Sequence, residues 1–265
     1  MCRDLHPTVQ KYVNSARLAE TYDEYFCRTP LFAFDCGFIA RHLGLPRDPA
    51  KEYSVLDLGC GTGRHLLLCA ENGCRAVGVD LNPHMLVEAK KKLLSRRKRR
   101  PVVLTPGHDE QIRLLRGNFI DISMFDRDRF DAALMMFSTL GLVEGGKKRE
   151  EFLIRLRDVL RPGGTLILHV HNELRHRRPG LFGLLGDLRH MARRLEPGDH
   201  IQHNYRGELD LYLHYFTPGE LRELIDRTGY EIKEFMLLNE TRDGPLESTL
   251  DPDCANGFLV AAHSP

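Results

Sequence analysis

The sequence lacks tryptophan, an apolar run long enough to cross a membrane, and any clear excess of one charge. A membrane-spanning helix needs about 18 or more apolar residues in a row, so we expect no membrane segment. Lys and Arg number 38 against 37 for Asp and Glu, which leaves a formal net charge of +1. So small a charge predicts no polyanionic partner, and only a local basic cluster could argue for one.

The cysteines also lack a pattern. There are seven of them, an odd number, and no two form a Cys-x-x-Cys pair. This is more typical of a reducing compartment than of a disulfide framework. The N-terminal segment MCRDLHPTVQKYVNS has no apolar stretch that resembles a secretory signal. We therefore expect a cytoplasmic protein.

The chain of 265 residues fits one α/β domain, in which residues 51–265 follow a helical cap at residues 1–50. From Tyr53 onwards, apolar strands alternate with helical segments, which predicts a mostly parallel sheet covered on both faces. Residues 172–204 interrupt the alternation and are predicted to be an insert that shapes substrate access. The expected strands are Tyr53–Leu58, Arg75–Asp80, Ile112–Leu115, Phe130–Phe137, Thr165–His171, Tyr230–Leu238 and Gly257–His263.

The first strand runs into the glycine-rich segment VLDLGCGTGRHLL at residues 55–67. Such a turn could hold the pyrophosphate of a dinucleotide or the methionine end of S-adenosylmethionine (SAM). A dinucleotide-binding turn places its third glycine where the helix packs closely on the strand, and that position is Arg64. The bulky side chain disfavours a nicotinamide-dependent oxidoreductase.

The spacing of Gly59, Gly61 and Gly63 after Asp57 instead resembles motif I of the class I SAM-dependent methyltransferases. Further segments resemble that family in the same order: Asp80, 19 residues after Gly61, then FDA at 130–132 and LRPGGTLIL at 160–168. The resemblance covers residues 53–263. It implies a doubly wound, Rossmann-like α/β sheet of seven strands with the last one antiparallel, and SAM as the cofactor.

The resemblance also implies roles for single residues. Asp57 would meet the ammonium group of SAM directly or through water, and Asp80 would accept hydrogen bonds from the ribose hydroxyls. Asn118 stands where the family has an acid near adenine, and Phe137 ends a motif that faces the transferred methyl group. The expected cofactor-binding residues are Asp57, Gly59, Cys60, Gly61, Gly63, Asp80, Leu81, Asn118, Phe119 and Phe137.

The segment RGELDLYLHYF at residues 206–216 concerns the methyl acceptor. Together with the capping box that begins at Thr217, it resembles a segment of the tRNA wobble-uridine carboxymethyl methyltransferases. That resemblance implies that Arg206, Tyr212 and His214 are catalytic residues beside the methyl group. Basic residues at 96–100 and 175–194 could then bind the tRNA.

Several functions stay open at this level. A small-molecule acceptor is favoured over tRNA because the net charge is only +1. A non-catalytic SAM-binding protein is the alternative from another class, since an intact binding motif does not show that methyl leaves. No metal site is predicted, because His169, His171, His200 and His203 lack a Cys or an acid at ligand spacing.

Overall fold

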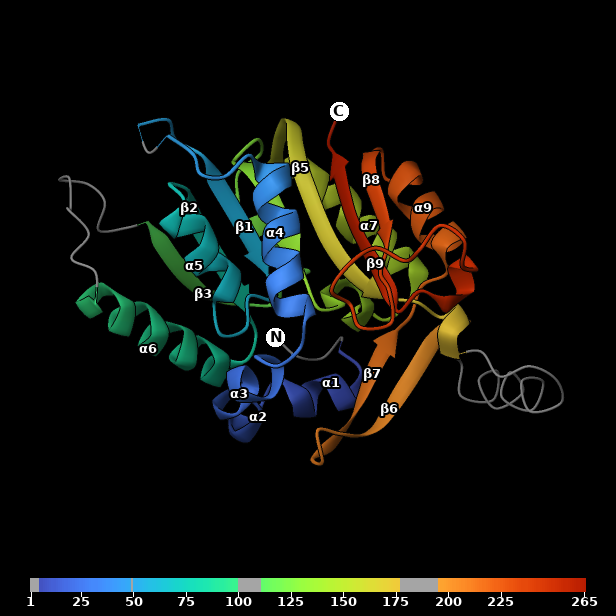
Figure 1. Ribbon diagram of the computed structural model, residues 1–265. Coiled ribbons are helices and arrows are strands. Elements are labelled where there is room, and N and C mark those ends of the chain that lie inside the picture. Colours follow the sequence, from blue (N-terminus) through green and yellow to red (C-terminus); the bar gives the residue numbers. More distant parts are fainter. Residues whose placement is uncertain (1–4, 49, 100–110, 177–194) are drawn as a thin grey trace, which may run out of the picture.

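A computed structural model describes residues 5–48, 50–99, 111–176 and 195–265 (Figure 1). Its centre is a seven-stranded sheet in the order β3-β2-β1-β4-β5-β9-β8. The strands are β1 (Ser54–Leu58), β2 (Arg75–Asp80), β3 (Ile112–Arg116), β4 (Phe130–Met135), β5 (Leu160–His171), β8 (Glu231–Leu237) and β9 (Gly257–His263). β1 to β5 are parallel, and β9 runs antiparallel to both β5 and β8. The predicted α/β fold, with its last strand antiparallel, is confirmed.

Helices cover both faces of the sheet (Figure 1). One face carries α4 (Leu31–Leu43), α5 (Arg64–Glu71) and α6 (Pro83–Arg99), and the other carries α7 (Gly146–Val159) and α9 (Pro218–Arg227). The edge strands β3 and β8 are half-buried or exposed, whereas the central strands β1, β4 and β9 are almost wholly buried between these layers. This explains why their sequences are continuous apolar runs rather than alternating ones.

The start of α9 follows the predicted capping box. The hydroxyl of Thr217 accepts a hydrogen bond from the backbone N–H of Glu220 at 3.1 Å, and the Glu220 carboxylate accepts one from the Thr217 N–H at 3.4 Å. Two N–H groups that no helical carbonyl can reach are thereby satisfied. Glu220 is held in place by this box, which becomes important for its second contact, described below.

Two further units lie at the edge of the sheet where the parallel strands end (Figure 1). The first consists of the short helices α1 (Pro7–Tyr12), α2 (Ala16–Glu20) and α3 (Tyr22–Phe26). The second is an antiparallel hairpin of β6 (Asp199–Tyr205) and β7 (Leu209–His214). They meet where the hydroxyl of Thr8 accepts a hydrogen bond from the Tyr212 N–H at 2.8 Å.

The hairpin was not expected, because residues 199–204 were assigned to the insert. Its strands pair a segment of the expected insert with the segment that follows it. Asn204, Arg206 and Gly207 turn the chain between them in the left-handed backbone region. The sequence of β6 does not alternate between polar and apolar residues, because most of its residues are half-buried or exposed. The strand could therefore not be recognised from its pattern.

The remaining short elements are 3-10 turns: η2 (Ile122–Met124), η3 (Thr139–Leu142), η4 (Leu174–His176) and η5 (Pro252–Cys254). η3 follows β4 after a short connection and begins with Thr139 at the carboxyl edge of the sheet. Among the described residues, no helix is both long and apolar enough to span a membrane.

Candidate active site

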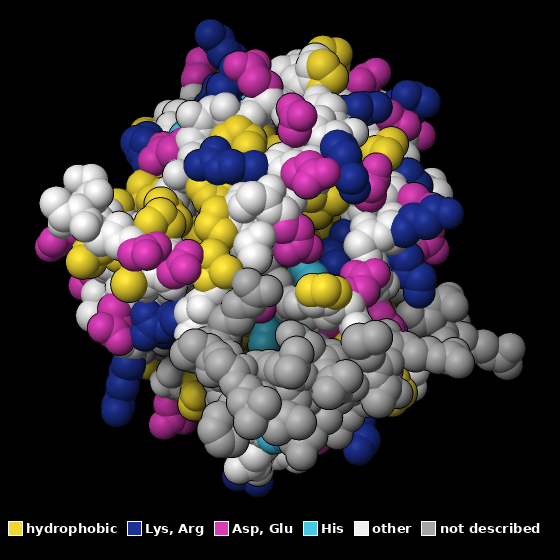
Figure 2. All heavy atoms as spheres, turned by 90° about the vertical axis from the view of Figure 1, so that its right-hand side faces the viewer, with side chains coloured by type: hydrophobic (Ala, Val, Ile, Leu, Met, Phe, Trp, Pro, Cys, Tyr) yellow, Lys and Arg dark blue, Asp and Glu magenta, His cyan; other side chains and the backbone are white. Residues whose placement is uncertain are grey.

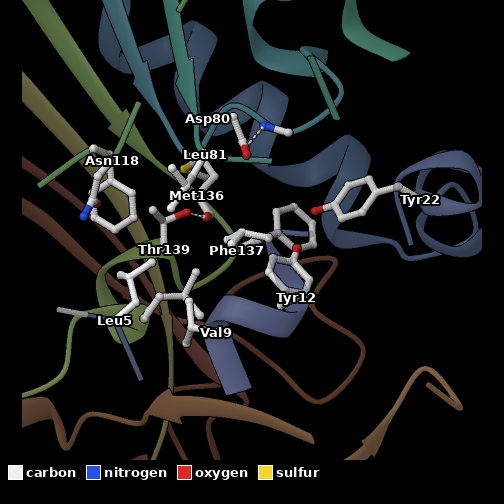
Figure 3. A pocket seen from close by; sticks show the side chains of 15 residues that line it. Leu5, Val9, Tyr12, Tyr22, Asp80, Leu81, Asn118, Met136, Phe137 and Thr139 are labelled. Carbon is white, nitrogen blue, oxygen red and sulfur yellow. Dashed lines mark hydrogen bonds between the residues drawn. The ribbon is translucent and has the colours of Figure 1, made fainter. Parts of the chain in front are cut away.

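A pocket lies between the carboxyl ends of β1 to β4 and the N-terminal helices (Figure 3). Asn118 and Tyr22 lie at its opposite ends, with Asp80 and Leu81 on one side and Leu5 and Val9 on the other. Its lining residues are Leu5, Val9, Tyr12, Val13, Tyr22, Gly59, Gly61, Asp80, Leu81, Asn118, Phe119, Met136, Phe137, Thr139 and Leu142. Seven of these were predicted as cofactor-binding residues: Gly59, Gly61, Asp80, Leu81, Asn118, Phe119 and Phe137.

Two glycines of the turn contribute to the pocket in different ways. Both have positive φ angles, +72° at Gly59 and +51° at Gly61, which a side chain would strain. A Cβ atom at Gly59 would lie 2.8 Å from the side chain of Thr139, so this glycine allows close packing. A Cβ atom at Gly61 would meet no protein atom within 4 Å. Gly61 therefore leaves its backbone open to the pocket.

Gly63 and Cys60 do not line the pocket. A Cβ atom at Gly63 would come within 3.2 Å of the Ala89 side chain, so this glycine lets the start of α5 pack against α6. Cys60 is buried, and its sulfur would lie 2.8 Å from a Cβ atom at Gly78. These two residues shape the turn from behind instead of forming the pocket wall.

Asp80, at the end of β2, ties the glycine turn to the next loop. One carboxylate oxygen accepts a hydrogen bond from the Gly61 N–H at 2.8 Å, and the other accepts one from the Asn82 N–H at 2.8 Å. Burial raises the pKa of Asp80 to about 6 despite these bonds. Each carboxylate oxygen has a further lone pair, so Asp80 can still accept hydrogen bonds from a ligand in the pocket.

The side chain of Asn82 continues this connection to the N-terminal helices. Its amide donates hydrogen bonds to the carbonyl of Tyr12 at 3.3 Å and to that of Ser15 at 3.2 Å. Asn82 is almost fully buried. It thus anchors the helices that cover the pocket to the same strand end that supplies Asp80.

Asp57 lies under the turn and does not line the pocket. Its side chain is buried, and its Oδ2 atom has no hydrogen-bond partner. Burial raises the pKa of Asp57 to about 6. A buried carboxylate oxygen without a donor is costly, and an ammonium group or a water bound to one would satisfy it. The methionine end of SAM carries such an ammonium group, so the residues present fit this cofactor.

The structure also explains why Arg64 occupies the position of a dinucleotide-binding glycine. Its guanidinium donates to both carboxylate oxygens of Asp35 on α4, at 2.7 and 2.6 Å, and lies 3.9 Å from the centre of the Phe32 ring. Burial alone would raise the pKa of Asp35, but hydrogen bonds from Arg64 and His65 outweigh burial and bring it to about 2. The Arg64 side chain thus points away from the contact between β1 and α5, and it connects α5 to α4.

Phe137 forms the pocket wall after β4. Phe137 and Ser138 have φ angles of 54° and 59°, a left-handed backbone that is strained for residues with a side chain. The Phe137 ring packs edge-on against the rings of Phe26 and Phe32, with centroids 5.5 and 5.2 Å apart. Strain of this kind persists where the surroundings impose it, and it is concentrated at functional sites.

The three predicted catalytic residues do not line the pocket. The ring of His214 bonds to Asp199 at 2.7 Å and to Glu220 at 2.8 Å, and the Tyr212 hydroxyl donates to Asp199 at 2.6 Å. Burial opposes protonation of His214, but its two carboxylate partners raise its pKa overall. Arg206 donates to the Leu18 carbonyl at 3.0 Å and to the Thr21 hydroxyl at 2.6 Å. The structure places these side chains in contacts that fasten the hairpin to its neighbours.

Two clusters contain side chains of metal-binding type: Asp35 with Cys36 and His65, and Glu196 with Asp199 and His214. In each cluster an arginine already bonds to a carboxylate. Arg64 contacts Asp35 at 2.6 Å, and Arg149 contacts Glu196 at 2.9 Å. A cationic partner disfavours a second cation at the same oxygens. We assign no metal to either cluster.

Sequence reasoning considered Tyr22 both as part of a lid and as part of a buried helix face, but it missed that Leu5, Val9, Tyr12 and Val13 line the pocket. Leu5, Val9 and Val13 recur every four residues, a helical spacing that marks one face, and Tyr12 and Tyr22 complete the cover. The spacing was a usable signal, but it could not show that this face packs on the edge of the sheet. The N-terminal helical cap is therefore part of the pocket.

Of the basic residues considered for RNA binding, Arg175 has a described side chain, and it pairs with Glu240 at 2.8 Å. The other arginines of the insert, Arg177, Arg178, Arg189, Arg193 and Arg194, lie outside the described residues, as do Arg100 and the side chains at positions 96–99.

Known proteins resemble both the sequence and the fold. Residues 55–164 match a family model described as a methyltransferase domain. A tRNA U34 carboxymethyltransferase of Shewanella loihica is 35% identical over 123 residues, which are 45% of this chain and 32% of that protein. The chain thus spans about a third of the length of this curated relative.

Two solved structures share the architecture. A SAM-dependent methyltransferase from Methanosarcina mazei superposes with a TM-score of 0.60 at 25% identity, covering 80% of this chain and 92% of the other. A 1,6-didemethyltoxoflavin-N1-methyltransferase from Burkholderia thailandensis, solved with S-adenosylhomocysteine bound, has a TM-score of 0.59 at 17% identity and covers 98% of this chain and 90% of the other. Residues 55–164 thus match a methyltransferase domain, and the sheet order gives the chain the fold of the SAM-dependent methyltransferases to which it is similar.

Proposed function

We propose that this protein transfers a methyl group from SAM to a small-molecule acceptor. The observation that carries the proposal is the pocket at the carboxyl edge, where Asp80 and the open backbone of Gly61 face an apolar cover. When bound, SAM supplies a methyl group that its positive sulfonium already activates. The protein then has to hold the cofactor, align the acceptor and keep water out.

The residues of the chain divide this work between them. Asp80 accepts hydrogen bonds from the ribose hydroxyls, and Asn118 and Phe119 receive the adenine at the end of β3. Asp57 satisfies the ammonium group, directly or through water. Tyr12 and Tyr22 cover the pocket and limit access of water to it.

A small acceptor is supported by the cover and by the charge of the surface. Side chains of the N-terminal helices, Val9, Tyr12 and Tyr22, line the pocket, and a cover of this kind favours a small acceptor. Figure 2 shows acidic and basic side chains interspersed on the described part of the face that it views. A polynucleotide would require a contiguous positive surface.

Methylation of a tRNA wobble uridine is the second candidate. It is favoured by the relative named as a tRNA U34 carboxymethyltransferase and by the resemblance of residues 206–216. Tyr212 and His214 would have to act from a buried cluster, because both side chains are buried and bonded to acids. We propose for them a positioning role in either case.

The test has two steps. Calorimetry with SAM, S-adenosylhomocysteine and NAD measures cofactor choice, and we expect both SAM compounds to bind with NAD much weaker. Incubation with methyl-labelled SAM and a cell extract, separated into RNA and small-molecule fractions, then locates the label. Label in the small-molecule fraction supports the proposal, label in the RNA fraction selects the second candidate, and binding without transfer indicates a non-catalytic SAM-binding protein.

A further inference from the structure

The order of strands divides the carboxyl edge of the sheet into two parts. Asn118, Asp80 and Gly61 follow β3, β2 and β1, so the residues assigned to the cofactor occupy one side. β4 comes next, followed by Phe137 in the pocket wall, and then β5. An acceptor that meets the cofactor beyond Phe137 therefore approaches the end of β5, which carries His169 and His171.

His169 is a buried polar group near that position. Its ring centroid lies 5.9 Å from that of Phe137, and the side chain is fully buried. Neither ring nitrogen has a hydrogen-bond partner. Buried polar groups in folded proteins are almost always bonded, because an unsatisfied one loses its hydrogen bonds to water without replacement. Such a group needs an explanation, and a ligand that bonds to it would provide one.

The protonation state of His169 decides what it can bind. Burial is the main cause that lowers its pKa, to about 4, and the nearby charge of Arg242 acts in the same direction. The imidazole is therefore neutral near pH 7. It offers one N–H donor and one nitrogen acceptor, which together suit a hydroxyl or an N–H group of a ligand.

Further rings extend from His169 towards the hairpin. The ring centroids of His169 and His171 are 5.4 Å apart, those of His171 and Tyr215 are 5.2 Å apart, and those of Tyr215 and His200 are 4.6 Å apart. Together with Phe137 these rings form a continuous aromatic row. Stacking and edge contacts with such a row favour a flat, aromatic or heterocyclic ligand.

A positive charge lies close to this row. Arg242 is half-buried in the loop after β8, with a left-handed φ angle of 61°. Hydrogen bonds between the side chains of Asn239, Thr241 and Asp243 stabilise the loop, at 2.6 to 3.2 Å. Among the described residues, no acid forms an ion pair with Arg242. Burial and the neighbouring charge of Arg175 both lower its pKa.

We propose that the methyl acceptor is a flat small molecule with an anionic group, which Arg242 binds, and a hydroxyl or N–H group, which His169 binds. This inference rests on the proposed methyltransferase function and specifies its acceptor. It explains in one step the unsatisfied imidazole, the unpaired guanidinium and the row of rings between the pocket and the hairpin.

Two probes that differ in charge alone test the proposal: 4-hydroxybenzoate and 4-hydroxybenzamide. Each is titrated into protein saturated with S-adenosylhomocysteine, and binding is followed by calorimetry and by the ring ¹⁵N signals of His169. We expect the acid to bind about tenfold tighter than the amide or better, because hydrogen bonds between charged groups are stronger than those to a neutral amide. The His169 ring signals should shift with both probes.

Two variants separate the roles. Arg242→Gln should weaken the acid about tenfold and leave the amide unchanged, so that the two probes become equal. His169→Phe should weaken both probes by a similar factor, since both carry the hydroxyl. Arg222→Gln, an exposed arginine on α9, is the matched control and should change neither. An unchanged affinity for S-adenosylhomocysteine shows that each variant is folded.

The outcomes are distinct. Equal binding of acid and amide to the parent protein, binding of neither, or a preference for the acid that survives in Arg242→Gln overturns the acceptor proposal while the cofactor assignment stands. If the parent protein fails to bind S-adenosylhomocysteine, the proposed function fails, and the acceptor proposal fails with it.

Discussion

Two groups of polar residues lie at the same edge of the sheet, and they differ in how many of their hydrogen-bonding groups find a partner within the protein. In the buried cluster around His214, the imidazole, the Tyr212 hydroxyl and the Asp199 carboxylate all bond to one another or to Glu220. In the pocket region, Asp57 keeps an unsatisfied oxygen and Gly61 faces open space. A group that is satisfied within the protein supports the fold, whereas an unsatisfied one awaits a ligand.

This difference also shows that the type of a side chain does not by itself fix its role. Tyr, His and Arg in an alternating segment suggest catalysis, because these side chains can move protons and bind anions. The fold uses Tyr212, His214 and Arg206 to attach the hairpin to α9 and to the N-terminal helices. The following variants test the comparison, beginning with the largest expected effect.

Gly61→Val should weaken SAM binding most strongly. The new side chain would enter the open space above the turn, where it meets the cofactor and no protein atom. Overpacking costs about 1–3 kcal/mol or more, so we expect affinity to fall about a hundredfold. Calorimetry with S-adenosylhomocysteine measures the loss.

Gly163→Val is the matched control for this variant. Gly163 also has a positive φ angle, +74°, and open space around its Cβ position, but it lies in the turn before the core of β5. Both variants should lose about 1–3 kcal/mol of stability from backbone strain. If Gly61→Val binds the cofactor as well as Gly163→Val does, Gly61 does not face the cofactor.

Asp80→Asn should have the next largest effect. Replacing an ionised acceptor weakens its bonds to the ribose hydroxyls, and each charge-assisted bond contributes about 1.5–3 kcal/mol. We expect the dissociation constant for S-adenosylhomocysteine to rise by about 10-fold to 100-fold. Asp131→Asn is the control, since Asp131 also accepts a backbone N–H bond, from Ser54 at 2.7 Å, but does not line the pocket. Equal losses in the two variants would contradict the assignment of Asp80.

Asp57→Asn should change stability and binding in opposite directions. The parent carboxylate has its pKa raised to about 6, so its ionised form is disfavoured in the fold. Asp57 therefore lowers the stability of the parent protein as pH rises from about 4 to about 6. In this range the folded state keeps the carboxyl proton, whereas the unfolded state has lost it. The amide avoids this loss and should stabilise the free protein at pH 8 by about 1–2 kcal/mol.

The same variant should bind SAM more weakly, because the ammonium group loses a negative partner. Urea denaturation with and without S-adenosylhomocysteine measures both effects. A variant that is destabilised without ligand, or that binds as tightly as the parent, would show that Asp57 serves the fold and not the cofactor.

His214→Gln should have the smallest effect on the cofactor and a clear one on stability against pH. The raised pKa of His214 means that its protonated form stabilises the fold below the unfolded pKa of about 6.5, and that this contribution is lost as pH rises through the folded pKa. The free energy of unfolding of the parent minus that of the variant should therefore be about 1 kcal/mol larger at pH 5.5 than at pH 9.

Denaturation at the two pH values, with exposed His203→Gln as control, tests this difference. S-adenosylhomocysteine affinity should stay within about twofold of the parent, since His214 does not line the pocket. A large loss of affinity with no change in the pH dependence would place His214 in the site and remove the contrast between the two groups.

The sequence alone determined the local parts of this protein. Apolar runs identified the central strands, because strands buried on both faces have no polar side. The spacing of Gly59, Gly61 and Asp80 predicted a pocket at the ends of β1 and β2, since a turn and the next strand end are close in both sequence and space. The capping box at Thr217 was visible for the same reason.

The tertiary structure decided what lies far apart in the sequence. Leu5, Val9 and Tyr22 cover a pocket formed more than thirty residues later, and His214 meets Asp199 only through the pairing of β6 with β7. Arg64 finds Asp35 on another helix, and His169 finds no partner at all. A local pattern records which side chains can form bonds, but only the packed chain decides which of those bonds the protein completes and which it leaves for a ligand.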